Sequence, residues 1–491
     1  MNPLKRLASQ TAVYGLSSIV GRFLNYLLVP LFTYYFTPAE YGVVSEFYAY
    51  AGFFSVLLLF GFETGYFRFR NKDSTVPDVA YSTALRFLLG ANLTFFFLLW
   101  FASGGIAGAL QYSAHPEYVA WIAAILALDA VGAVAFAKLR AEEKALRFAG
   151  IKILEILVNV GLCLLLIVYC RGAHESAPHS FFGALWDPAI GVGYIFIANL
   201  VASGVKLVLL APQLRGITKG FDGALFGKML RYSLPMVIIG FAGIVNEMLD
   251  RAMMKYLLPG TQAENLAQLG IYSACYKLSI LMSLFIQAFR YAGEPFFFAH
   301  AKDKNAPQIY ADVLRYFVIF CAFIFLLVTL YLDVFKYFVG EPFRAGLTIV
   351  PILLLANLFL GIYVNLSIWY KLTDRTLMGA YVSVGGALIT AGLLFWWVPL
   401  IGYQGAAWAT LVCYFSMALA SYLLGRKYYP VPYPVGRILA YIGFAVLLYL
   451  TNTYFTAWTR TPALVSGTVL LVVYLGVAYL FDARKLLRRA V

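Results

Sequence analysis

One cation interrupts the first long apolar stretch of the sequence, and its setting suits it to bind an anion. Arg22 shares a helical face with Ser18 and Asn25, because these residues are spaced four and three positions apart. Gly21 and Pro30 allow the same stretch to bend. A charge deep in an apolar environment is costly unless it is paired or hydrated. We therefore expect Arg22 to line a water-filled cavity; a buried structural ion pair is the alternative interpretation.

A second group joins two acids and a cation near residue 250. Glu247 and Arg251 lie one helical turn apart, and Asp250 adjoins Arg251. Carboxylates this close to a guanidinium can hold a proton or a small cation and release it when a partner charge arrives. The pattern predicts an ion-coupling site at Glu247 and Asp250.

Further charges fall inside apolar segments, mostly near the beginning of each half of the chain. We expect them to face one charged cavity, although simpler interpretations remain open. Arg290 could form a surface pair with Glu294, Lys152 could extend its ammonium group to the membrane interface beside Glu155, and Arg68 could be an interfacial anchor. The candidates for substrate binding are Arg22, Asn25, Arg68, Arg251, Lys277 and Arg290, and those for ion coupling are Glu63, Asp129, Glu247 and Asp250.

The elements that position these residues are predicted to be membrane-spanning helices. Of the 491 residues, 62% are hydrophobic and 12% are charged, whereas soluble domains carry about 25% charged residues. A span needs about 20 apolar residues, and about fourteen such segments with short connectors account for the whole chain. The predicted segments are 8–34, 40–66, 79–103, 117–139, 147–170, 189–211, 231–258, 269–294, 309–335, 346–370, 377–400, 404–425, 437–456 and 463–481.

Lysine and arginine alternate between successive connectors. Roughly two dozen fall on one side of the predicted membrane and about four on the other, and the positive-inside rule then places both termini in the cytoplasm. The net charge of +14 does not indicate nucleic-acid binding, because the cations lie at helix ends rather than on one soluble face.

Two stretches about six spans apart resemble each other. Residues 41–48 and 269–276 each contain a glycine, a serine three positions later and a tyrosine three positions after that; each stretch later reaches an aromatic end with arginine and glutamate. An even offset gives both copies the same orientation, although chance similarity between apolar helices is the alternative. We predict an all-α integral membrane protein with a pseudo-twofold parallel repeat. Its predicted parts are a lobe of about six helices at 1–215, a second at 216–427, and two further helices with a basic tail at 428–491.

Enzyme signatures are missing from the sequence. The four histidines show no metal-ligand spacing, no phosphate-binding loop occurs, and the five cysteines lie in apolar segments without the spacing of a metal site. We therefore predict no catalytic residue, no metal and no cofactor beyond a coupling ion, H⁺ or Na⁺.

Several stretches of the chain resemble a known family. The stretch from Tyr14 to Gly42, residues 62–69, the pair Asp250-Arg251 and residues 290–298 are similar to polysaccharide-biosynthesis (O-antigen type) flippases of the multidrug/oligosaccharidyl-lipid/polysaccharide exporter superfamily. The resemblance implies alternating access around a central cationic cavity and a polyprenyl-diphosphate-linked oligosaccharide as cargo. It also implies that Arg22 and Arg251 compensate the diphosphate charge, and that an ion gradient or the membrane potential drives the movement.

The leading hypothesis is thus a flippase that carries a lipid-linked oligosaccharide to the outer leaflet of a bacterial inner membrane. Its expected partners are this substrate, membrane lipids and glycan polymerase or assembly proteins, with no nucleic acid. A cation-coupled multidrug exporter of the same superfamily is the alternative, and a membrane-embedded glycosyl or acyl transferase is a third hypothesis.

Overall fold

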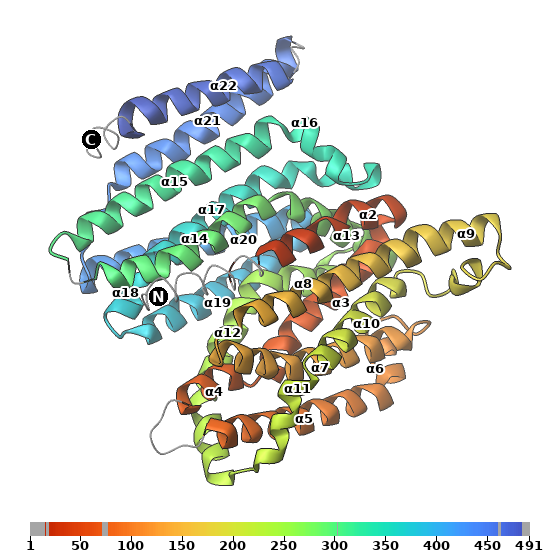
Figure 1. Cartoon of the computed structure of the whole chain (residues 1–491). Helices are drawn as coiled ribbons and strands as arrows, with labels where there is room; N and C mark the ends of the chain where they lie inside the picture. Colours follow the sequence, from red (N-terminus) through yellow and green to blue (C-terminus); the bar gives the residue numbers. More distant parts are fainter. Residues whose placement is uncertain (1–14, 16–18, 71–76, 302, 460–462, 484–491) are drawn as a thin grey trace. The chain divides into compact units, whose positions relative to one another are not determined.

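The computed structural model describes residues 15, 19–70, 77–301, 303–459 and 463–483 (Figure 1). The chain divides into two compact units, Met1–Ala252 and Met253–Val491, called here the first and the second unit. The lobe limits predicted from the internal repeat, after residues 215 and 427, stay predictions.

The first unit is a set of long helices joined by short connectors. Its helix α3 starts with a capping box, in which the Thr37 hydroxyl accepts from the Glu40 backbone N–H and the Glu40 carboxylate accepts from that of Thr37. The helices are α2 (Leu28–Tyr35), α3 (Pro38–Leu58), α4 (Phe62–Arg70), α5 (Pro77–Phe101), α6 (Ser103–Ala109), α7 (Pro116–Ala141), α8 (Ala145–Cys163), the π-helix η1 (Leu164–Cys170), α9 (Arg171–Ser176), η2 (Gly183–Leu185), α10 (Gly193–Leu209), α11 (Ala211–Leu214), η3 (Arg215–Lys219) and α12 (Gly223–Leu257).

One core of the first unit lies where α4, α5, α7 and the start of α12 meet. Phe62, Tyr81 and Met229 are almost completely buried there, and α5 and α7 lie side by side (Figure 1). The turn η3 is fixed to α5 because the Ser82 hydroxyl and the Arg86 guanidinium both donate to the Ile217 carbonyl, at 2.8 and 2.9 Å. These two hydrogen bonds supply donors to the Ile217 carbonyl, which a short turn would otherwise leave without a partner.

The second unit begins with another capped helix. Thr261 and Glu264 repeat the capping box of α3 at the start of α13. Both α3 and α13 are followed at a break by a second helix, α4 and α14, which agrees with the predicted repeat. The helices are α13 (Gln262–Leu278), α14 (Ile280–Ala299), α15 (Ala306–Leu330), α16 (Leu332–Phe335), η4 (Lys336–Phe338), η5 (Glu341–Ile349), α17 (Val350–Leu366), α18 (Ile368–Leu372), α19 (Thr376–Ile401), α20 (Tyr403–Tyr428), α21 (Val435–Thr459), α22 (Ala463–Ala478) and the π-helix η6 (Tyr479–Ala483).

Close helix contacts hold the second unit together. A Cβ at Gly361 of α17 would lie 2.6 Å from the Phe317 ring of α15, so only glycine allows this approach. The Tyr370 hydroxyl hydrogen-bonds the Ser421 hydroxyl at 2.7 Å and so ties α18 to α20. The last two helices, α21 and α22, lie along α15 (Figure 1).

The predicted spans can be compared with the described helices. Eleven of these are long and apolar enough to cross a membrane, or up to 13 if each of two bent pairs, around Leu210 and Ser279, is one span. The exact number of fourteen stays a prediction, because the first predicted segment, 8–34, lies partly outside the described residues. All five cysteines are buried and reduced, as expected of packing residues.

Candidate functional site

A buried lysine organises the charges inside the first unit. Lys206 of α10 is 3% exposed, and its ammonium group lies 2.5 Å from Asp129 Oδ1 on α7 and 2.7 Å from Glu155 Oε1 on α8. Ser203, one turn earlier on α10, donates to the same Asp129 oxygen at 2.7 Å. Lys152 completes the set at 3.0 Å from the other Glu155 oxygen. We call these five residues the Lys206 cluster.

The local sequence explains how the cluster fits between three helices. A Cβ at Gly132 would lie 3.3 Å from Lys206 Cε, so the missing side chain makes room for the lysine stem one turn beyond Asp129. Asp129 lies near the middle of α7, in a window of mean hydropathy 2.2. An ion pair at this depth compensates the cost of burying its members only when each charge is bound. The Lys206 cluster meets that condition.

The helical stretch 19–26, which carries Arg22 and Asn25, lies against the same helix α8. The Asn159 amide reaches the Asn25 side chain at 3.5 Å, and a Cβ at Gly21 would lie 2.6 Å from the Ile156 side chain. Arg22 itself is exposed and has no hydrogen-bond or ion-pair partner among the described residues. An exposed guanidinium, without a partner in the described part of the chain, therefore lies on a helical stretch that contacts α8, the helix that also carries Glu155 and Lys152. Ser18, the third member of the predicted polar face, lies outside the described residues.

The acidic group on α12 differs in detail from its sequence pattern. Arg251 donates to the Glu247 backbone carbonyl at 2.8 Å, not to the Glu247 carboxylate, and lies 3.9 Å from Asp250 Oδ1. Asp250 is buried and Glu247 is exposed. The α12 helix approaches α3 closely here, because a Cβ at Gly52 would lie 2.4 Å from Met248 Sδ.

Two other candidates in the first unit are engaged with partners. Glu63 of α4 forms an ion pair with Arg140 of α7. The Arg68 guanidinium lies over the Tyr232 ring, 4.2 Å from its centre. Each contact joins α4 to a neighbouring helix and stabilises their packing.

The remaining candidates belong to the second unit. Arg290 is exposed and lies 3.4 Å from Glu294, whose same oxygen binds Lys371 at 2.5 Å. Lys277 is half-buried near the end of α13. No group of three or more metal-ligating side chains occurs in the described part of the chain.

The sequence reasoning missed Lys206, Ser203 and Asn159. The signal available for Lys206 was a lone lysine in the apolar stretch 193–209, near its end. No pattern in one sequence pairs α7, α8 and α10, so the partners of Asp129 and Glu155 emerge only from the fold.

The long apolar helices of the described residues define a multi-pass membrane protein with charged groups in its interior. The sequence profile described as "polysaccharide biosynthesis protein" matches residues 7–298, more than half of the chain, which therefore belongs to this family. This confirms the resemblance predicted from the sequence. No characterised, curated protein matches the chain by sequence.

Solved structures share the fold over nearly the whole chain. A structure of the lipid II flippase MurJ in an inward closed conformation superposes with a TM-score of 0.70 at 13% identity, covering 96% of this chain and 99% of its own. An inward-facing multidrug resistance MATE family transporter of the MOP superfamily gives 0.63 at 15% identity, covering 89% and 98%. A MATE structure in a bent conformation gives 0.56 at 15% identity, covering 91% and 98%.

Proposed function

We propose that the protein is a flippase that moves a polyprenyl-diphosphate-linked oligosaccharide from the cytoplasmic to the outer leaflet of a bacterial inner membrane by alternating access. The proposal rests on the family and on one observation, the exposed Arg22 on a helical stretch that contacts α8, the helix that carries Glu155 and Lys152. A guanidinium binds diphosphate oxygens through paired N–H donors. The cations of the cluster are already bound to carboxylates, whereas Arg22 is exposed and has no such partner in the described ranges, so it can bind an incoming anion.

The direct test is transport by the purified protein in proteoliposomes. A fluorescent polyprenyl-diphosphate oligosaccharide should cross the bilayer with the wild-type protein and about tenfold more slowly with Arg22→Gln, since one charge-assisted contact is lost. Arg22→Lys should recover part of the rate. Lys144→Gln is the matched control, because Lys144 is an exposed cation paired with Glu142 at 2.7 Å.

The competing function is a cation-coupled multidrug exporter. Such a pump needs acidic residues where its drug binds, whereas the charge exposed on the stretch 19–26 is cationic. Movement of a cationic dye, with no movement of the lipid-linked oligosaccharide, would favour the exporter and refute the flippase.

We also propose that ion coupling occurs at Asp129. Protonation of its carboxylate would remove one of the two negative charges that hold Lys206, so a proton gradient could change the pairing between α7 and α10. Transport by Asp129→Asn should lose its dependence on a pH gradient. Glu63→Gln should keep that dependence, because Glu63 is bound by Arg140 in a separate pair. If instead Glu63→Gln loses it, or Glu247→Gln and Asp250→Asn do, the coupling site lies elsewhere.

For the topology we retain the arrangement predicted from the charges of the connectors. Both termini, which lie outside the described residues, are proposed to face the cytoplasm. Glycan polymerase or assembly proteins remain proposed partners.

A further inference from the structure

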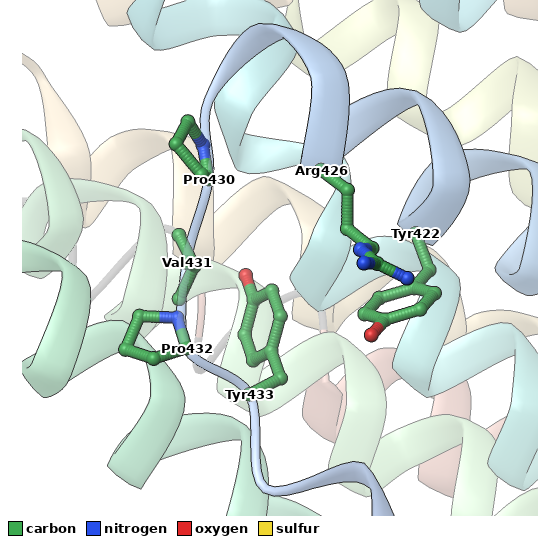
Figure 2. A pocket seen from close by; sticks show the side chains of 6 residues that line it. All are labelled: Tyr422, Arg426, Pro430, Val431, Pro432 and Tyr433. Carbon is green, nitrogen blue, oxygen red and sulfur yellow. The ribbon is translucent and has the colours of Figure 1, made fainter.

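A pocket in the second unit lies where the chain leaves one candidate span and enters the next. Its volume is about 540 Å³, and it opens between the end of α20 and the connector that leads to α21 (Figure 2). The lining residues are Tyr422, Arg426, Pro430, Val431, Pro432 and Tyr433. The pocket thus contains a cation and two phenols and is walled by two prolines.

The connector wall is held in shape by its own sequence. Pro430 and Pro432 fix their backbone φ angles, and the Tyr433 N–H donates to the Val431 carbonyl at 2.8 Å. Val431 packs against the buried group of Phe297 and Tyr310. The wall is therefore pre-organised, and a ligand would lose little free energy in ordering it.

The cation of this pocket is available to a ligand. Arg426 is exposed, and its guanidinium lies over the Tyr422 ring, 6.0 Å from the ring centre (Figure 2). Among the described residues, none accepts a hydrogen bond from this guanidinium. Lys427 and Arg375 lie on the faces of the neighbouring Tyr428 ring, at 5.4 and 4.3 Å. None of these three cations forms an ion pair with a described residue. The local charge is thus positive, and no described carboxylate is paired with it.

The phenol of Tyr433 adds a hydrogen-bond donor. Its ring lies 6.4 Å from that of Tyr422, on the opposite wall (Figure 2). Burial raises the pKa of Tyr433 above its usual value, and the nearby phenols of Tyr429 and Tyr310 raise it further. The hydroxyl therefore stays protonated at physiological pH and can donate to an anion.

The pocket lies at the depth where lipid phosphates are found. The candidate spans end at Tyr428 and begin again at Val435, so the connector between them lies at the edge of the hydrocarbon layer. Basic pockets between spans at this depth suit phosphate-containing head groups. We propose that Arg426 and Tyr433 form a binding site for the phosphate of an anionic membrane lipid. The site shares no residue with the proposed cargo contacts, and it does not depend on the proposed transport activity.

The test measures lipid binding by the full-length protein in detergent, using native mass spectrometry with phosphatidylglycerol, phosphatidylcholine and inorganic phosphate as probes. Phosphatidylglycerol should bind more tightly than phosphatidylcholine. Arg426→Gln should weaken phosphatidylglycerol binding about tenfold, and Tyr433→Phe should weaken it about threefold. Lys427→Gln is the matched control, because it removes the same charge one residue away from the lining; it should change binding less than about twofold.

Several results would overturn the proposal. Equal losses in Arg426→Gln and Lys427→Gln would mean that the connector attracts anionic lipids only through its general charge. Unchanged binding in both Arg426→Gln and Tyr433→Phe would exclude the pocket. Displacement of the lipid by millimolar inorganic phosphate would make a free phosphate the ligand. If Arg426→Gln fails to fold, as judged by size-exclusion chromatography, Tyr433→Phe carries the test alone.

Discussion

The two units of the chain use buried charge in different ways. In the first unit, Lys206 binds carboxylates from two other helices, near the middle of a candidate span. In the second, Arg315 of α15 lies 3.3 Å from Asp482 in η6, at the end of the last described helix. The first arrangement places titratable groups between helices, where a change of charge can alter packing. The second fastens the final helices to α15.

The largest effect is expected from Lys206→Met in the first unit. Lys206 is buried and the Glu155 side chain is largely buried, so removing Lys206 leaves the Glu155 carboxylate without this cation, at a cost of up to about 3 kcal/mol in stability; the half-exposed Asp129 adds less. Thermal and denaturant unfolding in detergent should show this loss. Lys206→Arg should be much milder, and Lys152→Gln, at the more exposed edge, milder still. A Lys206→Met protein as stable as the wild type would show that the buried charges of the first unit contribute no more to stability than those of the second.

A smaller effect is expected from Asp482→Asn in the second unit. The amide can still accept from the Tyr441 hydroxyl, which lies 2.6 Å from Asp482, but it loses the charge that faces Arg315. We expect a loss of about 2 kcal/mol in stability with transport activity unchanged, because the pair only fastens helices. Unfolding and proteoliposome transport, measured on the same preparation, check both parts. If transport is reduced while stability is unchanged, the Arg315–Asp482 pair takes part in transport, as is proposed for the Lys206 cluster.

The capping boxes should behave alike in the two units. Thr37→Ala and Thr261→Ala each remove the side chain that caps the first turn, and each should cost about 1 kcal/mol. Serine at either position should restore most of the loss, since its hydroxyl makes the same bond. A large difference in unfolding between the two alanine variants would show that the units are less alike than α3 and α13 indicate.

The smallest effect on stability is expected from Asn25→Ala. The contact between Asn25 and Asn159 is long and exposed, so stability should change by less than about 0.5 kcal/mol. Transport should nevertheless fall, because Asn25 lies one turn from Arg22 on the face assigned to cargo. Unchanged transport in the proteoliposome assay would limit the cargo contact to Arg22.

Much of the architecture could be predicted from the sequence because it is local. Apolar length and connector charge predict the spans, and 13 of the candidates match described helices when the bent pairs are counted as single spans. The Thr37–Glu40 motif directly predicts where a helix starts. The breaks at the ends of α3 and α13 were not predicted, because each lies inside one continuous apolar run.

The candidate site was predictable only in part. Arg22, Asp129 and Glu155 can be recognised as charges in apolar segments, because this is a property of the local sequence around each residue. Their partners depend on which helix faces lie together, and that is a long-range property of the folded chain.

The sequence by itself determined the class of protein, the approximate spans and which charged residues lie inside apolar segments and therefore require a partner or hydration. Only the tertiary structure decided that Lys206 binds both Asp129 and Glu155, that Arg251 donates to a carbonyl of its own helix, and that Arg22 has no partner among the residues the structure describes. The physical reason is that hydropathy acts on each segment separately, whereas the pairing of a buried charge depends on what the neighbouring helix presents to it.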